Sequence, residues 1–250
     1  MPHFWRRLAL TLKEGYLFDR LRARLTRRPA EDMDSVLAQV LGQMQAPVVF
    51  ECGVFNGEIT HKLCSYLPSG FSAYYAWEPD PRSVERIGKR GLPEGVQLIE
   101  AAVGAKDGKA SFHLSGQTAA TADDVSGVGS SLRKPMEKNE TFYPWMTFGE
   151  QVEVQVFSLD SFCRRQGVDH IDFIWADVQG AERDLIQGGR ETLKKTKVMF
   201  LEQEGYRLYE GQWLFPELMK DLGPDWRLAC RFPSDVLLYN RKLIEPPQIT

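Results

Sequence analysis

The sequence predicts an α/β protein with a doubly wound, Rossmann-like sheet of seven strands, mostly parallel and ending in a C-terminal antiparallel hairpin. From about residue 31 onward, short apolar runs alternate with segments whose apolar residues recur at helical spacing. The last two apolar runs, residues 226–232 and 235–240, are joined by a connection short enough for a hairpin. The chain has 250 residues, of which 43% are hydrophobic and 26% charged, which is typical of one large globular domain.

Residues 1–30 are predicted to form a separate basic, amphipathic helical segment, and residues 31–250 a single globular domain. Residues 1–28 contain eight basic and two acidic side chains, although the whole chain has a net charge of -3. Apolar residues recur there at helical spacing from Phe4 to Leu25. Such a segment packs on the domain, joins two copies in a homo-oligomer, or rests on an anionic membrane surface. Because the remainder is acidic and has no nucleic-acid-binding signature, we expect no nucleic-acid partner.

The lengths of the apolar runs bear on the expected cellular location. None reaches the ~20 residues that cross a bilayer, and the N-terminal residues have no uninterrupted apolar core of a signal peptide. We therefore expect a cytoplasmic protein, with peripheral contact at the inner face of the membrane through residues 1–30 as the alternative.

The first half of the domain is predicted to contain a helix followed by three strands separated by helices. The expected elements are a helix ending before Pro47, a strand at 48–51, a helix ending at Pro68, a strand at 72–79, a helix closing at Gly91 and a strand at 96–104.

The alternation then stops. The stretches "KASFHL" and "QVEVQVFSLD", residues 109–114 and 151–160, are typical of strands, and they frame an inserted loop or lid at residues 115–150. So long an irregular segment is uncommon in a compact domain unless it serves the site. The alternation resumes with a strand at 171–176, a helix at 181–189, a strand at 197–204, a helix at 214–222 and the terminal hairpin.

Every predicted parallel strand ends on or beside a carboxylate: Glu51, Glu78, Glu100, Asp177, or Glu202 with Glu204. In open α/β sheets, ligands bind outside these carboxyl ends. Carboxylates repel phosphate. The loop after the first strand also lacks the glycine pattern of a dinucleotide fold or a P-loop, which disfavours an NAD-linked oxidoreductase.

The same loop suits a cationic ligand without phosphate. Gly53 and Gly57 let the backbone approach a ligand closely, and Glu78 can accept both hydroxyls of a ribose. A ligand with an ammonium group, a sulfonium charge and a ribose is S-adenosylmethionine (SAM). We therefore expect SAM as the cofactor.

Six stretches together resemble the FkbM family of class I SAM-dependent methyltransferases. They are "VVFECGVFNGEIT", "YAWEPDP", "LIEAAVGAKDGKASFH", "GSSL", "VFSLDSF" and "IDFIWADVQGAERDLIQGG", in this order. The likeness runs from about residue 48 to 204, continues loosely to Asn240, and leaves the basic segment uncovered. It implies that residues 31–250 form a SAM-dependent methyltransferase domain that methylates hydroxyl groups, commonly those of sugars.

The resemblance also implies roles for individual residues. Glu51, Gly53, Asn56 and Gly57 would hold the methionine part of SAM, Glu78 its ribose, and Ala101 and Ala102 beside Glu100 its adenine. The flanking residues Phe55, Pro79 and Val178 are expected to contact the same cofactor, with Asp177 near the transferable methyl group. The sequence departs from the family pattern twice: Glu51 stands where Asp is usual, and Gln179 where Glu is frequent.

A hydroxyl acceptor needs a base within hydrogen-bond reach. We expect Asp177 in this role, with Glu202 or Glu204 positioning the acceptor and His113 as the competing base. These three carboxylates form an incomplete ligand set for a divalent cation, so we expect no metal.

Acceptor binding is assigned to Ser131, Tyr143, Trp145 and Gln179, because the aromatic rings can stack on a sugar face and the polar groups lie near the expected methyl group. The predicted partner is therefore a sugar, glycan or glycosylated acceptor. Two other interpretations stay open: a SAM-binding assembly or regulatory subunit without catalysis, and a methyltransferase acting on a non-sugar small molecule.

Overall fold

A computed structural model describes residues 32–117, 126–137 and 142–249 of the protein. Its main sheet has seven strands in the order β3-β2-β1-β7-β8-β10-β9. The first five of these pair in parallel, and β10 pairs antiparallel with both β8 and β9, which confirms the predicted fold. The strands are β1 (Val48–Cys52), β2 (Ala73–Trp77), β3 (Val96–Ile99), β7 (Ile171–Ala176), β8 (Thr196–Glu202), β9 (Trp226–Arg231) and β10 (Asp235–Asn240).

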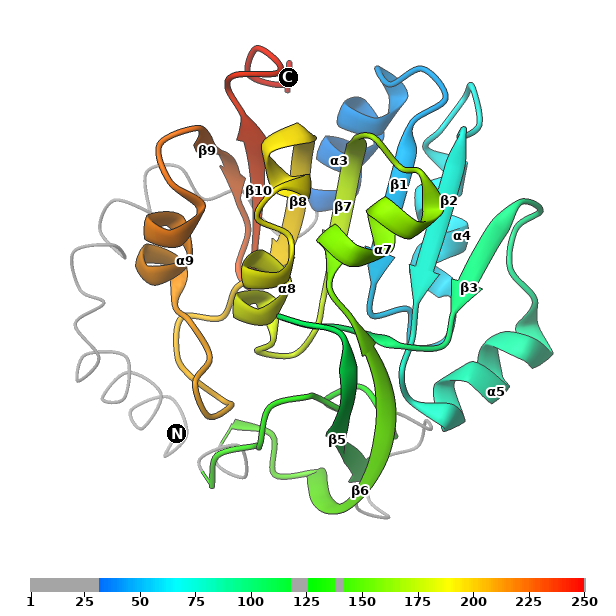
Figure 1. The fold of residues 1–250 in the computed structure, drawn as a ribbon, viewed down its shortest axis with the longest axis vertical. Helices are drawn as coiled ribbons and strands as arrows, with labels where there is room; N and C mark the ends of the chain where they lie inside the picture. The colour runs from blue at the N-terminus through cyan, green and yellow to red at the C-terminus, as the bar shows by residue number, and fades with distance from the viewer. Residues whose placement is uncertain (1–31, 118–125, 138–141, 250) are drawn as a thin grey trace.

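Helices cover both faces of this sheet, so most of its strand residues are buried (Figure 1). One face carries a core to which α7, α8, α9 and the 3-10 helix η1 contribute, and the opposite core receives residues of α3, α4 and α5. The helices are α3 (Asp32–Gly42), α4 (Glu58–Ser65), α5 (Pro81–Arg90), α7 (Leu159–Gln166), α8 (Glu182–Gly188), η1 (Thr192–Lys195) and α9 (Phe215–Leu222).

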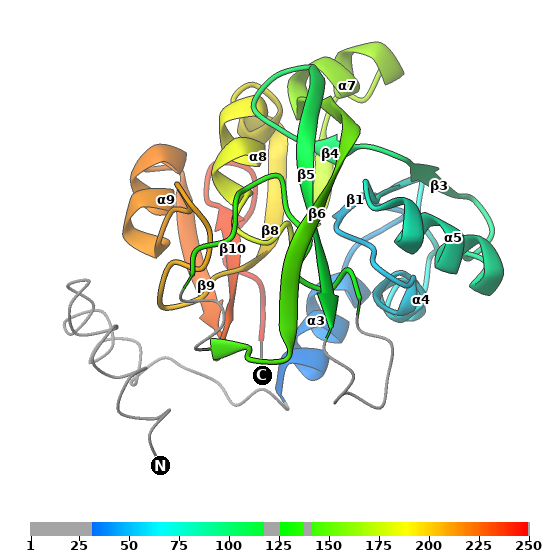
Figure 2. The same ribbon diagram turned by 90° about the horizontal axis from the view of Figure 1, so that it is seen from below.

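A second, three-stranded sheet lies across the carboxyl ends of the parallel strands (Figure 2). Its order is β4-β6-β5, and its long strands β5 and β6 pair antiparallel. Its strands are β4 (Ala102–Val103), β5 (Gly108–Gln117) and β6 (Met146–Phe157). The ends of β1, β2 and β7 are therefore covered by a wall from another part of the chain.

The second sheet corrects three sequence expectations. The expected strand at 96–104 is divided, because the Ala101 nitrogen donates to the Ile99 carbonyl and the chain turns into the other sheet. Strands β5 and β6 extend into the expected 115–150 loop through cross-strand pairing, so its ends are strand. The expected strand at 151–160 stops at Phe157, because the Ser158 hydroxyl caps a helix that begins at Leu159.

Two further expectations bear on the N-terminal segment and the membrane. The predicted basic helix at residues 1–30 lies outside the described residues. Across the part of the chain that the structure describes, no helix combines the length and apolarity needed to cross a bilayer.

Candidate active site

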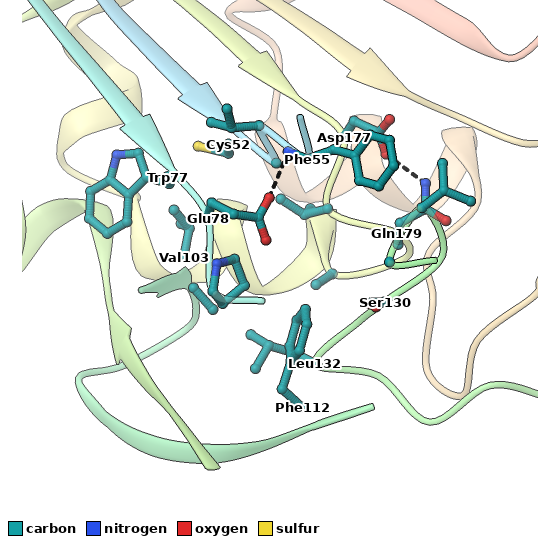
Figure 3. A pocket seen from close by; sticks show the side chains of 18 of the residues that line it. Cys52, Phe55, Trp77, Glu78, Val103, Phe112, Ser130, Leu132, Asp177 and Gln179 are labelled. Atoms are coloured by element: carbon teal, nitrogen blue, oxygen red, sulfur yellow. Dashed lines mark hydrogen bonds between the residues drawn. The ribbon is translucent and has the colours of Figure 1, made fainter. Parts of the chain in front are cut away.

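A cavity of about 230 Å³ opens where β1, β2 and β7 end (Figure 3). Parallel strands deliver their C-terminal residues to one edge of the sheet, so residues far apart in sequence meet here. Ten residues predicted for the site line the cavity: Gly53, Phe55, Asn56, Glu78, Pro79, Ala101, Ala102, Asp177, Val178 and Gln179.

Gly53 allows the ends of β1, β2 and β7 to pack closely at the cavity. Its φ of +91° is left-handed, and a Cβ built there would lie 2.0 Å from the carbonyl oxygen of Asp177. The Gly53 nitrogen donates to the Trp77 carbonyl at 3.0 Å, and the Asp177 nitrogen donates to the Cys52 carbonyl at 2.9 Å. Only glycine allows the three strand ends to lie this close together.

Glu78 anchors the loop that follows β1. The two oxygens of its buried carboxyl group accept from the Phe55 nitrogen at 2.7 Å and from the Asp80 nitrogen at 2.8 Å. Burial raises the pKa of Glu78 to about 7, although these backbone donors favour the charged form. Each oxygen has a further lone pair, so Glu78 can still accept from hydroxyl groups of a ligand.

One wall of the cavity is apolar and was missing from the sequence-based site. It consists of Trp77, Val103, Phe112 and Leu132, two of which come from the second sheet (Figure 3). The apolar alternation of Ala110, Phe112 and Leu114 indicated a strand with one covered face. Nothing local indicated that this face would border the site.

Two adjacent serines fasten residues 126–137, the described middle part of the 115–150 segment, to opposite sides of the cavity. The Ser130 hydroxyl donates to Asp80 Oδ2 at 3.1 Å, on the β2–α5 side. The Ser131 hydroxyl donates to the Gln179 carbonyl at 2.6 Å, on the β7–α8 side. Ser130 lines the cavity, whereas Ser131, expected to bind the acceptor, is fully buried and instead holds the backbone of Gln179.

The opposite side of the cavity is acidic. The Gln179 Nε2 atom donates to Asp177 Oδ1 at 2.6 Å and to Glu202 Oε2 at 2.8 Å. Desolvation by burial raises the pKa of Asp177 and raises that of Glu202 well above its usual range. Of these two carboxylates, only Asp177 is among the residues that line the cavity.

Three residues expected to bind the cofactor are not among those lining the cavity. Glu51 is fully buried beneath the loop, where it accepts from the Tyr74 hydroxyl at 2.6 Å, and burial raises its pKa to about 7. Gly57 is the N-cap of α4, with a φ of +82°. Glu100 is exposed, because the chain turns away after β3.

Four residues expected near the acceptor also lie outside the cavity lining. His113 pairs with Ser131 through an isolated β-bridge, and burial lowers its pKa. The Tyr143 hydroxyl donates to Glu204 Oε1 at 3.0 Å, and the Tyr143 ring meets that of Trp145 edge-on at 6.1 Å between centroids. Tyr143, Trp145 and Glu204 thus form a separate polar–aromatic cluster. None of the three residues lines the cavity.

The sequence profile described as the methyltransferase FkbM domain matches residues 51–232, which span every strand end of the site. The chain belongs to the FkbM methyltransferase family. The match omits the basic N-terminal residues.

Two comparisons with individual proteins extend this result. The chain is 35% identical over 245 residues to the 2-O-methyltransferase NoeI of Sinorhizobium fredii, with 93% of this chain and 98% of the relative covered. A crystal structure of methyltransferase FkbM from Methylobacillus flagellatus aligns with a TM-score of 0.50 and 13% identity. That alignment covers 87% of this chain but 49% of the other, so the chain spans about half the length of that solved protein.

Proposed function

We propose that this FkbM methyltransferase is SAM-dependent and transfers a methyl group to a hydroxyl of a sugar, glycan or glycosylated acceptor. The observation that carries the proposal is the position of Asp177. This carboxylate lines the same cavity as Gly53 and Glu78, the two features suited to a close-packed, ribose-containing cofactor. The likeness to a protein named as a 2-O-methyltransferase supports a hydroxyl acceptor.

The donor set of the cavity fits SAM. Gly53 lets the ends of β1 and β7 close against each other at the cavity, and the loop backbone there and Asn56 would receive the methionine part. The free lone pairs of Glu78 would accept the ribose hydroxyls. The apolar side chains of Ala101, Ala102 and Phe112, which also line the cavity, would cover the adenine ring. When bound, SAM supplies a methyl group on a sulfonium, which is already activated for transfer.

The protein's own contribution is alignment, exclusion of water and acceptance of one proton. Asp177 would take the proton of the acceptor hydroxyl. The electron pair of the broken O–H bond would stay on the acceptor oxygen, which would form the new bond to the methyl carbon, and the electrons of the carbon–sulfur bond would go to sulfur. The lid residues around Ser130 border the same space and would limit the entry of water.

Calorimetry and a product assay test this proposal on the full chain. SAM binding is measured first, and release of S-adenosylhomocysteine is then followed across sugars, glycans and non-sugar alcohols and phenols. We expect binding, and turnover on a sugar hydroxyl. SAM binding without turnover on any acceptor would favour the non-catalytic SAM-binding subunit. Turnover on non-sugar acceptors alone would reject the sugar as the acceptor. Tight NAD binding without SAM binding would reject the proposal.

A further inference from the structure

Gln179 stands between two carboxylates in the acidic side of the cavity, and its role can be inferred from its contacts. We propose that Gln179 is a positioning residue and not an acceptor ligand. Its amide holds Asp177 and Glu202 as a pair that shares one proton, with Asp177 as the ionised member facing the cavity. This inference rests on the proposed function, because Asp177 is there the base.

The hydrogen bonds of Gln179 are all made to other groups of the protein. A side-chain amide has two N–H donors, and both are used, one on Asp177 Oδ1 at 2.6 Å and one on Glu202 Oε2 at 2.8 Å. The amide oxygen lies 3.0 Å from the Tyr209 hydroxyl, and the backbone carbonyl accepts from the Ser131 hydroxyl at 2.6 Å. No donor of the Gln179 amide is left for a substrate.

The backbone of Gln179 is held in an uncommon conformation. Its φ of +51° lies in the left-handed region, which few residues other than glycine adopt. Gly180 follows with a φ of +86°, and a Cβ there would come within 2.8 Å of the Tyr209 ring. The Ser131 hydrogen bond and Tyr209 thus fix the turn from both sides. Such strain persists where the surrounding structure demands one side-chain direction.

The charge of the surroundings explains why an uncharged donor stands here. The acidic and phenolic groups facing the pair are Glu182 from α8, Glu204 after β8, Asp235 from β10, and Tyr209. Within the described ranges, no lysine or arginine forms an ion pair with Asp177, Glu182, Glu202 or Asp235.

Two adjacent, strongly desolvated carboxylates without a cation retain a proton between them. The hydrogen bond from Gln179 favours the ionised form of Asp177, and Asp177 and Glu202 also contact each other directly. A glutamine stabilises the negative charge without adding another, whereas a glutamate would place a third carboxylate against the pair. Because Asp177 and not Glu202 lines the cavity, the acceptor's proton would pass to Asp177 and leave the pair neutral.

A ligand-free measurement tests the pairing. The side-chain carboxyl carbons of aspartate are labelled with ¹³C, the Asp177 signal is identified by its loss in Asp177→Asn, and its titration is followed by NMR. In Gln179→Met, which has similar length but no donor, we expect the pKa of Asp177 to rise. In Gln179→Glu, which keeps a polar side chain at the strained turn, it should rise as well.

The matched control is Gln203→Met. Gln203 is a neighbouring buried glutamine, but its Nε2 atom donates to the Trp213 carbonyl at 3.4 Å. The same substitution there should leave the Asp177 titration unchanged. An unchanged titration in both Gln179 variants would overturn the proposal.

Kinetics on an accepted substrate give a second readout. In Gln179→Met, kcat should fall by about tenfold to hundredfold, the factor carried by one hydrogen bond to a charged group. The acid limb of the kcat/KM profile should move to higher pH, and KM for the acceptor should stay within about twofold. A raised KM with an unmoved pH profile would make Gln179 an acceptor ligand and reject the positioning role.

The two proposals fail separately. If no acceptor is turned over, the proposed function fails, and the NMR titration alone decides whether Gln179 pairs the two carboxylates. If turnover is observed and Asp177 titrates identically with methionine at position 179, the positioning role fails while the methyltransferase activity stands.

Discussion

Gly53 and Asp177 touch backbone to backbone: a Cβ on Gly53 would lie 2.0 Å from the Asp177 carbonyl oxygen. The variant Gly53→Ala must therefore push β1 and β7 apart and also adopt a left-handed φ. We expect the free energy of unfolding to fall by about 2 kcal/mol or more, and SAM binding to be lost with the loop geometry. Urea unfolding and calorimetry measure the two effects.

Gly70→Ala is the matched control for this clash. Gly70 also has a left-handed φ, +65°, but nothing lies within 4 Å of a Cβ built there. In Gly70→Ala the free energy of unfolding should fall by about 1 kcal/mol, which is the cost of the left-handed backbone conformation alone. SAM affinity should not change. Equal losses at both glycines would show that the close approach of Gly53 to Asp177 has no energetic consequence.

Asp177→Asn tests the proposed base. Asparagine keeps the shape of the side chain but accepts no proton, so kcat should fall by about 10²- to 10⁴-fold, while SAM affinity changes little. His113→Gln, at the competing base, should cause no comparable loss because the ring does not line the cavity. Steady-state kinetics on an accepted substrate decide between them. An Asp177→Asn variant as active as the parent would exclude Asp177 as the base.

Glu78→Gln tests the anchor of the first loop. The carboxylate accepts from two backbone N–H groups, and the amide nitrogen of glutamine would face one of these donors. We expect SAM affinity to fall by about tenfold to hundredfold. Glu100→Gln, at an exposed strand end outside the cavity, should leave the affinity unchanged. Calorimetry of both variants is the measurement, and equal affinities would reject the assignment of Glu78.

Glu51→Gln tests how a buried carboxyl group couples stability to pH. The pKa of Glu51 is about 7 in the fold, against 4.5 for a free glutamate side chain, so the folded protein holds this proton more tightly. The contribution to stability is fully present below pH 4.5 and is lost as pH rises through 7, at up to about 1.4 kcal/mol per pH unit.

Glutamine removes this titration and keeps an acceptor for the Tyr74 hydroxyl. The free energy of unfolding of Glu51→Gln relative to the parent should therefore increase between about pH 5 and about pH 8. Urea unfolding across this range measures the difference, which cancels the contributions of the other buried carboxyl groups. A difference independent of pH would show that Glu51 does not titrate in this window.

Ser131→Ala tests the lid attachment. The alanine variant loses a buried hydrogen bond to the Gln179 carbonyl, so the free energy of unfolding should fall by about 1 to 3 kcal/mol, and kcat should fall with it. Ser65→Ala removes a similar hydroxyl-to-carbonyl bond, to Lys62, at an exposed site and should change stability by less than about 0.5 kcal/mol. If Ser131→Ala and Ser65→Ala changed stability equally, the hydrogen bond from Ser131 to Gln179 would have no special role in stability.

Several features of the site could be predicted from local sequence. The apolar run at residues 171–176 coincides with β7, and the carboxylates Glu78 and Asp177 were expected at strand ends where the structure has them. The glycine of the first loop, Gly53, was expected beside the ligand and lines the cavity. In each case the signal lies within a few residues, because strand periodicity and turn chemistry are local properties.

The directions of individual side chains needed contacts between distant segments. Glu51 lies in β1, two residues before Gly53, yet alternation along the strand turns its carboxyl group toward Tyr74 and away from the cavity. Gln179 was expected to meet the acceptor; in the fold it lines the cavity, and its amide nitrogen donates to Asp177 and Glu202. Ser130 and Ser131 are indistinguishable in sequence and face opposite sides of the site.

Local sequence patterns were sufficient to order the strands and helices along the chain and to show which strand ends carry acids and glycines. Contacts between distant segments were needed to place β10 between β8 and β9, to bring Phe112 of the second sheet to the cavity, and to join two carboxylates through Gln179. The reason is physical: periodicity specifies which face of an element is buried, but its partner is selected by packing and hydrogen bonding over the whole chain.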